Sequence, residues 1–349
     1  MANEIEKYNI IALGSIEKIN GLTDGNIQEI NGFEFTYVPP VSYKGILGFG
    51  TYAGGGSGDT GKTNLVSTSG VIAADTTAVG GGRRGLAACE FGTGEAIFAY
   101  GTIWNQGHGY GISNKVNTSG VVASDVSGIA VFRVNLAACG YGGDKGAFAY
   151  GNSPVNYDGW YDDLVNEKNL VSNSGVIGAS VAGVGTDRDW TAATQYGGDK
   201  GIFGFGHIAG SPYYLGITNL LSNSGVIGSD VTAVGAIRNN ISACSYGTGH
   251  TKGIFMPGQP DSSGGQVTNL VSDSGVIASD VSLVGTFRLN GGACEIGTDI
   301  AIDAFGAISG TAYVATSQLI SNLGVVSADV SAVAGVLARN SSAGCTFGT

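Results

Sequence analysis

The chain has 349 residues, of which only 12% are charged, and it carries a formal net charge of −11 at pH 7. This acidic balance argues against binding to nucleic acid or to an anionic membrane surface, since both require clustered lysines and arginines. The 62 glycines are accompanied by a hydrophobic fraction of 43%, which is enough apolar material to bury a core, so global disorder is not expected. No run approaches the roughly 18 apolar residues that a membrane-spanning helix needs, and we therefore expect no membrane insertion.

The N-terminal segment MANEIEKYNIIALGS contains acidic residues and lacks the apolar run of a signal peptide. The cysteine count is odd, at five. Together these features predict synthesis in a reducing cytoplasm without a secretory leader.

An internal repeat of about 50 residues dominates the chain, and its cysteines mark it. Each cysteine lies six residues after an arginine, and Thr194 replaces the cysteine in the copy that Arg188 begins. The five are Cys89, Cys139, Cys244, Cys294 and Cys345. Equivalent positions in successive repeats lie one structural unit apart, too far for a disulfide bond. We therefore expect these cysteines to be small buried hydrophobic residues.

Each copy contains four segments that alternate apolar and small or polar residues, as β-strands do. In the copy that begins at Arg238, these segments are 238–247, 252–258, 268–275 and 276–285. A glycine in the motif SxSGV separates the third from the fourth, which predicts a tight turn with a positive φ angle. Glycine interrupts every candidate helix. The chain is predicted to be all-β, and four strands in about 50 residues are typical of one propeller blade.

Six copies are clear, over residues 44–349, and residues 1–43 have the character of a divergent partial blade. The chain ends on RNSSAGCTFGT, which matches a first strand with nothing after it. Pairing this strand with the N-terminal segment would complete a seventh blade and close the ring, leaving no exposed edge. We therefore predict one domain over residues 1–349, a seven-bladed β-propeller, with six blades as the alternative.

The repeat unit resembles the kelch-like and RCC1-like propeller repeats. It is most similar to the glycine-rich versions in structural proteins of tailed bacteriophages, especially marine and cyanobacterial ones. Residues 141–152, 196–206 and 218–230 carry this resemblance. The double glycine and distant tryptophan of ordinary kelch blades are not kept. The resemblance implies a virion protein whose partners are other virion subunits or a host-surface receptor, and it leaves a homo-oligomer open.

Two further patterns suggest chemistry that their context does not support. Residues 56–63 match the phosphate-binding loop, but that loop requires a following helix, and a strand-like segment follows here. The three histidines, His108, His207 and His250, occupy non-equivalent loops without metal-binding spacing. We therefore expect no cofactor and no metal site, and we expect the histidines to be surface loop residues.

Acidic and basic residues also recur in register, which predicts a structural role, because a catalytic pair would occur once. The recurring acids are Asp75, Asp125, Asp230, Asp280 and Asp329, with Ser180 in the remaining copy.

Function is more readily sought where the copies differ, in the loops that join second and third strands. These loops are rich in aromatic residues, and the longest, 152–164, adds acidic ones. The candidate ligand-binding residues are Trp104, Tyr110, Tyr157, Asp158, Trp160, Tyr161, Asp162, Tyr213 and Tyr214. Aromatic faces stack on sugar rings while carboxylates bind hydroxyls, which favours glycan binding. Tyrosine and tryptophan are equally favoured in protein interfaces, so a subunit contact is the alternative.

These observations predict a non-enzymatic phage virion protein, a fibre- or tail-associated propeller for attachment to host-surface glycans. The alternatives are a head-decorating or tail-assembly protein with purely structural contacts, and a cellular lectin-like propeller.

Overall fold

The computed structural model describes residues 18–19, 22–23, 29–30, 33–34, 43–52, 58–103, 110–129, 132–153, 163–232, 234–260, 266–309 and 312–348. The chain divides into two compact units, residues 1–42 and 43–349. In the first unit β1 (Lys18–Ile19) pairs with β2 (Leu22–Thr23), and β3 (Glu29–Ile30) pairs with β4 (Phe33–Glu34). Every regular element in the described ranges is a strand, as predicted. These ranges contain no helix long and apolar enough to cross a membrane.

The second unit contains six antiparallel sheets of three or four strands, numbered here along the chain. Sheet 1 contains β5 (Tyr43–Gly48), β7 (Thr63–Ser67) and β31 (Ala343–Thr346). Sheet 2 contains β8 (Ala87–Phe91), β9 (Glu95–Ala99), β10 (Ile112–Val116) and β11 (Val126–Ser127). Sheet 3 contains β12 (Ala137–Tyr141), β13 (Lys145–Ala149) and β14 (Lys168–Val171).

Sheet 4 contains β15 (Ala192–Tyr196), β16 (Lys200–Gly204), β17 (Ile217–Leu221) and β18 (Val231–Thr232). Sheet 5 contains β20 (Ala243–Tyr246), β21 (Lys252–Phe255), β23 (Val267–Val271) and β24 (Val281–Ser282). Sheet 6 contains β25 (Gly292–Gly297), β26 (Ile300–Ala304) and β29 (Ser317–Ser321). Three two-stranded pairs extend the sheets: β6 (Thr51–Tyr52) with β30 (Arg339–Asn340), β19 (Arg238–Asn239) with β22 (Gln259–Pro260), and β27 (Ala307–Ser309) with β28 (Ala312–Tyr313).

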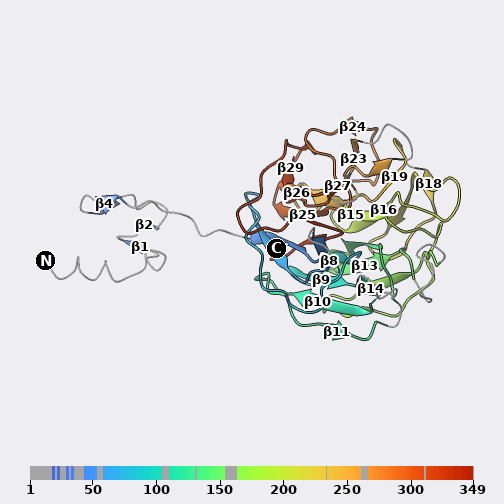
Figure 1. The fold of residues 1–349 in the computed structure, drawn as a ribbon, viewed down its shortest axis with the longest axis horizontal. Coiled ribbons are helices and arrows are strands. Elements are labelled where there is room, and N and C mark those ends of the chain that lie inside the picture. Colours follow the sequence, from blue (N-terminus) through green and yellow to red (C-terminus); the bar gives the residue numbers. More distant parts are fainter. Residues whose placement is uncertain are drawn as a thin grey trace. The chain divides into compact units, whose positions relative to one another are not determined.

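The six sheets follow one another around a common centre (Figure 1). Their inner strands are β8, β12, β15, β20, β25 and β31, and each of them contacts the next. The last of these, β31, also contacts β8, so the series of neighbours is cyclic. The chain therefore begins and ends its second unit in the same sheet.

The described residues contain no seventh blade of the predicted kind, because the C-terminal strand pairs with β5. Strand β31 pairs with β5, and Cys345 lies opposite Ile46 just as Cys89 lies opposite Ile97 in sheet 2. This register makes β31 the first strand of the repeat whose second strand is β5. The described residues thus contain six sheets of this kind, the alternative count, and the strands of residues 1–42 pair only with one another.

The hydrophobic core lies between neighbouring sheets, and the cysteines belong to it. All five are buried and free, as predicted. A side chain on Gly201 of sheet 4 would collide with the sulfur of Cys139 of sheet 3, and Gly146 stands in the same relation to Cys89. In sheets 3 and 4 the glycine of the KGxF segment therefore leaves room for the cysteine of the preceding sheet. Burial raises the pKa of Cys139 to about 12.

All of the recurring arginines except Arg288 stack on an aromatic ring of the preceding sheet. Arg188 is fully buried and donates to the carbonyl of Phe205 at 2.9 Å and to Asn219 Oδ1 at 2.7 Å. Its guanidinium lies 3.8 Å from the ring centroid of Tyr150, which belongs to sheet 3. Asn219 in turn donates to Asp230 at 2.8 Å. This chain of contacts supports the structural role predicted for the recurring Arg and Asp residues.

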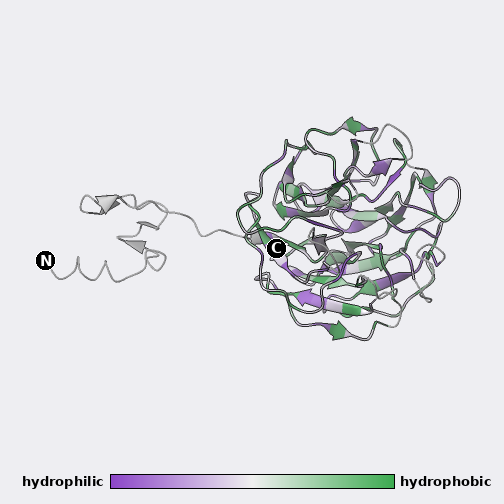
Figure 2. Cartoon of the chain, viewed as in Figure 1, coloured by the Kyte–Doolittle hydropathy of each residue, from purple (hydrophilic) through white to green (hydrophobic). Residues whose placement is uncertain are grey.

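The turn glycines and the outer strands complete the repeat. Gly225 has a φ of 81°, and the five equivalent glycines also have positive φ, as predicted. On the outermost strands β11, β18 and β24, hydrophobic residues face solvent (Figure 2). Val126, Val231 and Val281 are each more than half exposed.

Candidate functional site

The variable loops leave the sheets at the end where the recurring arginines lie, which we call the loop end. Strand-like bridges tie the start of each loop to the residue after an arginine. Thr102 pairs with Arg84 in sheet 2, and His207 pairs with Asp189 in sheet 4. In sheet 6 Ala307 pairs with Leu289 in the same way.

Three of the predicted ligand-binding residues are described: Tyr110, Tyr213 and Tyr214. Tyr213 is 58% exposed, whereas the other two are half-buried. The remaining candidates lie outside the described residues, and they are Trp104, Tyr157, Asp158, Trp160, Tyr161 and Asp162.

Tyr213 and Tyr214 belong to a cluster around a histidine and a buried carboxylate. His207 Nδ1 lies 3.0 Å from Asp189 Oδ1, and Asp189 is fully buried. Burial raises the pKa of Asp189, and the hydrogen bond with His207 opposes this rise. Asn135, from sheet 3, donates to the second carboxylate oxygen at 3.4 Å. The carboxylate therefore fixes the orientation of the imidazole.

The two tyrosines lie beside this imidazole. The ring of Tyr213 is nearly parallel to that of His207, with an interplanar angle of 8° and a centroid separation of 6.4 Å. The ring of Tyr214 is tilted by 57°, with its centroid at 6.3 Å. A backbone hydrogen bond of 2.9 Å from Ile208 to Tyr213 holds the loop in place. The rings of His207, Tyr213 and Tyr214 thus form a partly exposed aromatic surface, in which the carboxylate of Asp189 fixes the imidazole.

A ring of residues with left-handed backbone surrounds the axis at the loop end. One residue of each sheet takes part, with φ between 52° and 63°. The six are Gly85, Asn135, Trp190, Asn240, Asn290 and Ser341. Neighbouring members are joined by backbone hydrogen bonds, for example from Asn135 to Gly85 at 2.8 Å and from Trp190 to Asn135 at 2.9 Å. This ring holds Asn135 next to Asp189.

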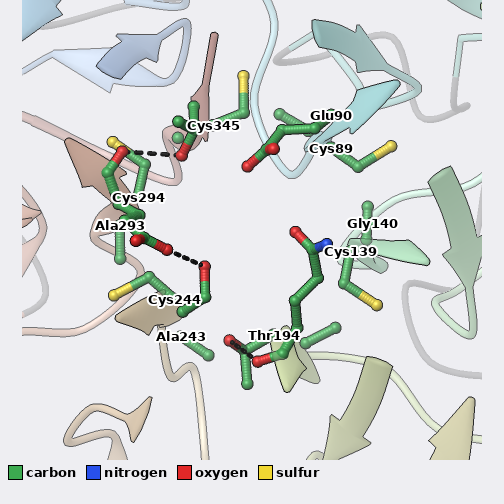
Figure 3. Close-up of a pocket in the computed structure, with 18 residues that line it drawn as sticks. Cys89, Glu90, Cys139, Gly140, Thr194, Ala243, Cys244, Ala293, Cys294 and Cys345 are labelled. Atoms are coloured by element: carbon green, nitrogen blue, oxygen red, sulfur yellow. Dashed lines mark hydrogen bonds between the residues drawn. The ribbon is translucent and has the colours of Figure 1, made fainter. Parts of the chain in front are cut away.

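The opposite end, where hairpin turns join first and second strands, is the turn end. A channel opens there, lined by three residues from each inner strand (Figure 3). The cysteine sulfur atoms point away from the opening, whereas Glu90 points into it. The residue after each cysteine position lines the channel, and these residues are Glu90, Gly140, Gln195, Ser245, Glu295 and Thr346.

His250, in the turn between β20 and β21, contacts two carboxylates of this channel. Its Nδ1 lies 2.7 Å from Glu295 Oε2 and its Nε2 lies 3.3 Å from Glu90 Oε2. Both nitrogens face carboxylates, so both must donate, which identifies the imidazolium form. Ser245 donates to Glu295 Oε2 at 2.9 Å. Burial alone would lower the pKa of His250, but Glu90 and Glu295 outweigh it and raise the pKa to about 11.

Two of the sequence-based expectations can be judged from these contacts. The expectation of surface histidines is wrong for His207 and His250, whose side chains are 12% and 16% exposed. His108 lies outside the described residues. The strand expected after the phosphate-loop pattern is confirmed, since β7 begins at Thr63, and Lys62 contacts Asp75 at 3.5 Å.

Sequence reasoning missed the channel residues. One signal was present: the turn that carries His250 spans residues 247–251, two residues longer than the turn 142–144 of sheet 3. In the described ranges no group of three His, Cys, Asp or Glu side chains is placed to hold a metal ion. No protein-family model matches the chain, and no curated protein is significantly similar to it.

Proposed function

We propose that residues 43–349 form a six-bladed β-propeller closed by its C-terminal strand, and that the protein is a non-enzymatic attachment module that binds through its loop end. The cyclic contacts of the inner strands and the pairing of β31 with β5 support the fold. The function depends on one observation, the cluster of Asp189, His207 and Tyr213, which only one of the six copies carries. A feature that breaks a uniform repeat on an accessible end is suited to recognition.

The ligand class that fits this cluster is a surface carbohydrate. The Tyr213 ring offers a flat apolar face, and its hydroxyl adds a hydrogen-bonding group. Because Asp189 fixes the imidazole of His207, little side-chain entropy is lost when a ligand binds beside it. The sequence resemblance adds the setting: a tail- or fibre-associated virion protein that attaches to a host-surface glycan and contacts other virion subunits.

Binding to a glycan array and to whole host cells tests this function. Tyr213→Ala is expected to weaken binding by about tenfold or more, because exposed aromatic anchors contribute strongly to recognition. Leu323→Ala is the matched control, since Leu323 is a 71% exposed residue in a turn at the opposite end of its sheet. Unchanged binding by Tyr213→Ala, or no binding by the wild type, would reject the glycan ligand.

A purely structural virion role predicts a different outcome. In that case the loop end contacts other subunits, and the protein co-purifies with capsids or tails and shows ordered contacts through Tyr213 in the particle. Attachment to glycans predicts that Tyr213 stays accessible in the assembled virion. Limited chemical modification of exposed tyrosines in intact particles distinguishes the two.

A further inference from the structure

The turn end of the channel contains a second polar site, independent of the loop end. Four of its charged or polar side chains come from different places in the ring: Glu90 from sheet 2, Gln195 from sheet 4, His250 from the turn of sheet 5 and Glu295 from sheet 6. Backbone hydrogen bonds between neighbouring turns fix the frame, for example from Gly92 to the carbonyl of Asp144 at 2.8 Å. The side chains therefore stand on a rigid support.

The charges of this group do not balance. Glu90 and Glu295 share one imidazolium, that of His250, which leaves one negative charge in excess. Glu295 is 4% exposed, so little water screens it. An excess charge in a buried setting is unfavourable unless a counter-charge or a hydrogen-bond donor compensates it. The neighbouring pair of Asp144 and Lys145 is neutral in itself and does not correct the imbalance.

Gln195 lines both the channel and the cavity at its turn end. It is 8% exposed, and in the part of the chain that the structure describes its side-chain amide forms no hydrogen bond. The amide lies over Gly140 of the neighbouring inner strand, where any larger residue would collide with it. Its donor and acceptor atoms are therefore presented to the channel, where a ligand can bond to them.

Glu90, Gln195 and His250 together line a cavity of about 160 Å³ at the mouth of the channel. This volume exceeds that of one water molecule, about 30 Å³, several-fold. Gly92, Gly140 and Gly143 leave the space open, since none of them has a side chain. The cavity can hold a short organic group.

We infer that this cavity binds a small primary ammonium ligand, held between the carboxylate of Glu90 and the amide oxygen of Gln195. An ammonium has one positive charge, which matches the excess, and three donors, which suit a carboxylate and an amide oxygen. A metal ion fits less well, since both nitrogens of His250 donate to carboxylates and cannot act as ligands.

Isothermal titration of the full chain with n-propylammonium tests the site, with 1-propanol as the neutral analogue. We expect saturable binding of the amine with a Kd of about 1 mM, given its few heavy atoms, and no binding of the alcohol. Glu90→Gln is expected to weaken binding at least tenfold, and Gln195→Leu several-fold. Asp299→Asn is the control, because Asp299 lines the separate cavity on the other side of His250.

The Asp299→Asn variant should bind like the wild type. Equal binding of amine and alcohol, or full affinity in Glu90→Gln, would overturn the assignment, as would no binding below about 100 mM, far weaker than the expected millimolar affinity. Loss of binding in Asp299→Asn alone would place the ligand in the wrong cavity and would equally overturn it. Thermal unfolding of each variant establishes that it is folded. If Glu90→Gln is not folded, Gln195→Leu takes its place as the test variant.

Discussion

The contact between Arg188 and Tyr150 is expected to stabilise the boundary between sheets 3 and 4, and a double-mutant cycle measures it. Arg188 donates three hydrogen bonds, to Phe205, Asn219 and Thr186, with lengths of 2.9, 2.7 and 3.1 Å. Arg188→Met leaves these three acceptors without a donor, and each unsatisfied acceptor lowers the free energy of unfolding by about 1–3 kcal/mol. Part of this loss is offset, because the variant no longer has to bury a guanidinium. The net loss should be about 4 kcal/mol.

The stacking contribution is the coupling between the two residues. The guanidinium lies 3.8 Å from the Tyr150 centroid in a buried setting, where a cation–π contact contributes about 2 kcal/mol. Unfolding by urea of the wild type, Arg188→Met, Tyr150→Leu and the double variant should therefore give a coupling of about 1–2 kcal/mol. Circular dichroism and fluorescence must give coincident transitions for this treatment to hold.

Arg188→Met combined with Phe98→Leu provides the control cycle. Phe98 lies in sheet 2 and packs on Phe49, so it shares no partner with Arg188. Its coupling should be below about 0.5 kcal/mol. If the cycle with Tyr150 gives no larger value than this control, the arginines do not fasten neighbouring sheets through the aromatic ring.

Two further predictions concern buried ionisable groups. Burial raises the pKa of Asp303 to about 6, from 3.8. The contribution of Asp303 to the free energy of unfolding is therefore fully present below pH 4 and is lost as the pH rises through 6. Asp303→Asn should therefore gain about 3 kcal/mol relative to the wild type between pH 4 and pH 8, and a pH-independent difference in unfolding free energy would refute this. The five buried cysteines should resist a thiol reagent such as DTNB in the native protein and all react in denaturant. Rapid labelling of any of them without unfolding would contradict their burial.

The repeat was readable from the sequence because its features are local and recur in register. The cysteine, the turn glycine and the arginine each serve a contact that most of the sheets repeat, such as Cys139 against Gly201. The partner of the C-terminal strand was not predicted correctly, although the chain carries the necessary sign. The segment 44–50 lacks a first strand and the C-terminal strand lacks a second, and the structure pairs these two with each other. The sequence pattern instead predicts a partner within residues 1–43.

The channel site escaped prediction for a different reason. Its members share one position of the repeat, directly after the cysteine, and only their identities differ: Glu90, Gln195 and Glu295 are polar where Gly140 is not. Functional variation is predicted in the loops, whereas here it occurs within a strand. The contact of His250 with Glu90, in a sheet distant in sequence, depends on the cyclic arrangement of the sheets, which no local pattern encodes.

The boundary between sheets 5 and 6 shows what an arginine of this repeat needs. The aromatic residue that receives it has a positive φ in the other sheets, as Phe205 does at 60°. Sheet 5 has Pro257 at this position, and proline cannot adopt a positive φ. Arg288, which would stack there, instead lies 3.7 Å from Asp303 and 2.7 Å from Asp329. Asp303 occupies a position at which sheets 2 to 5 have phenylalanine. The arginine that lacks an aromatic partner, Arg288, is thus the one that has the buried carboxylate of Asp303 beside it. This indicates that a guanidinium in this position requires either an aromatic face or a carboxylate.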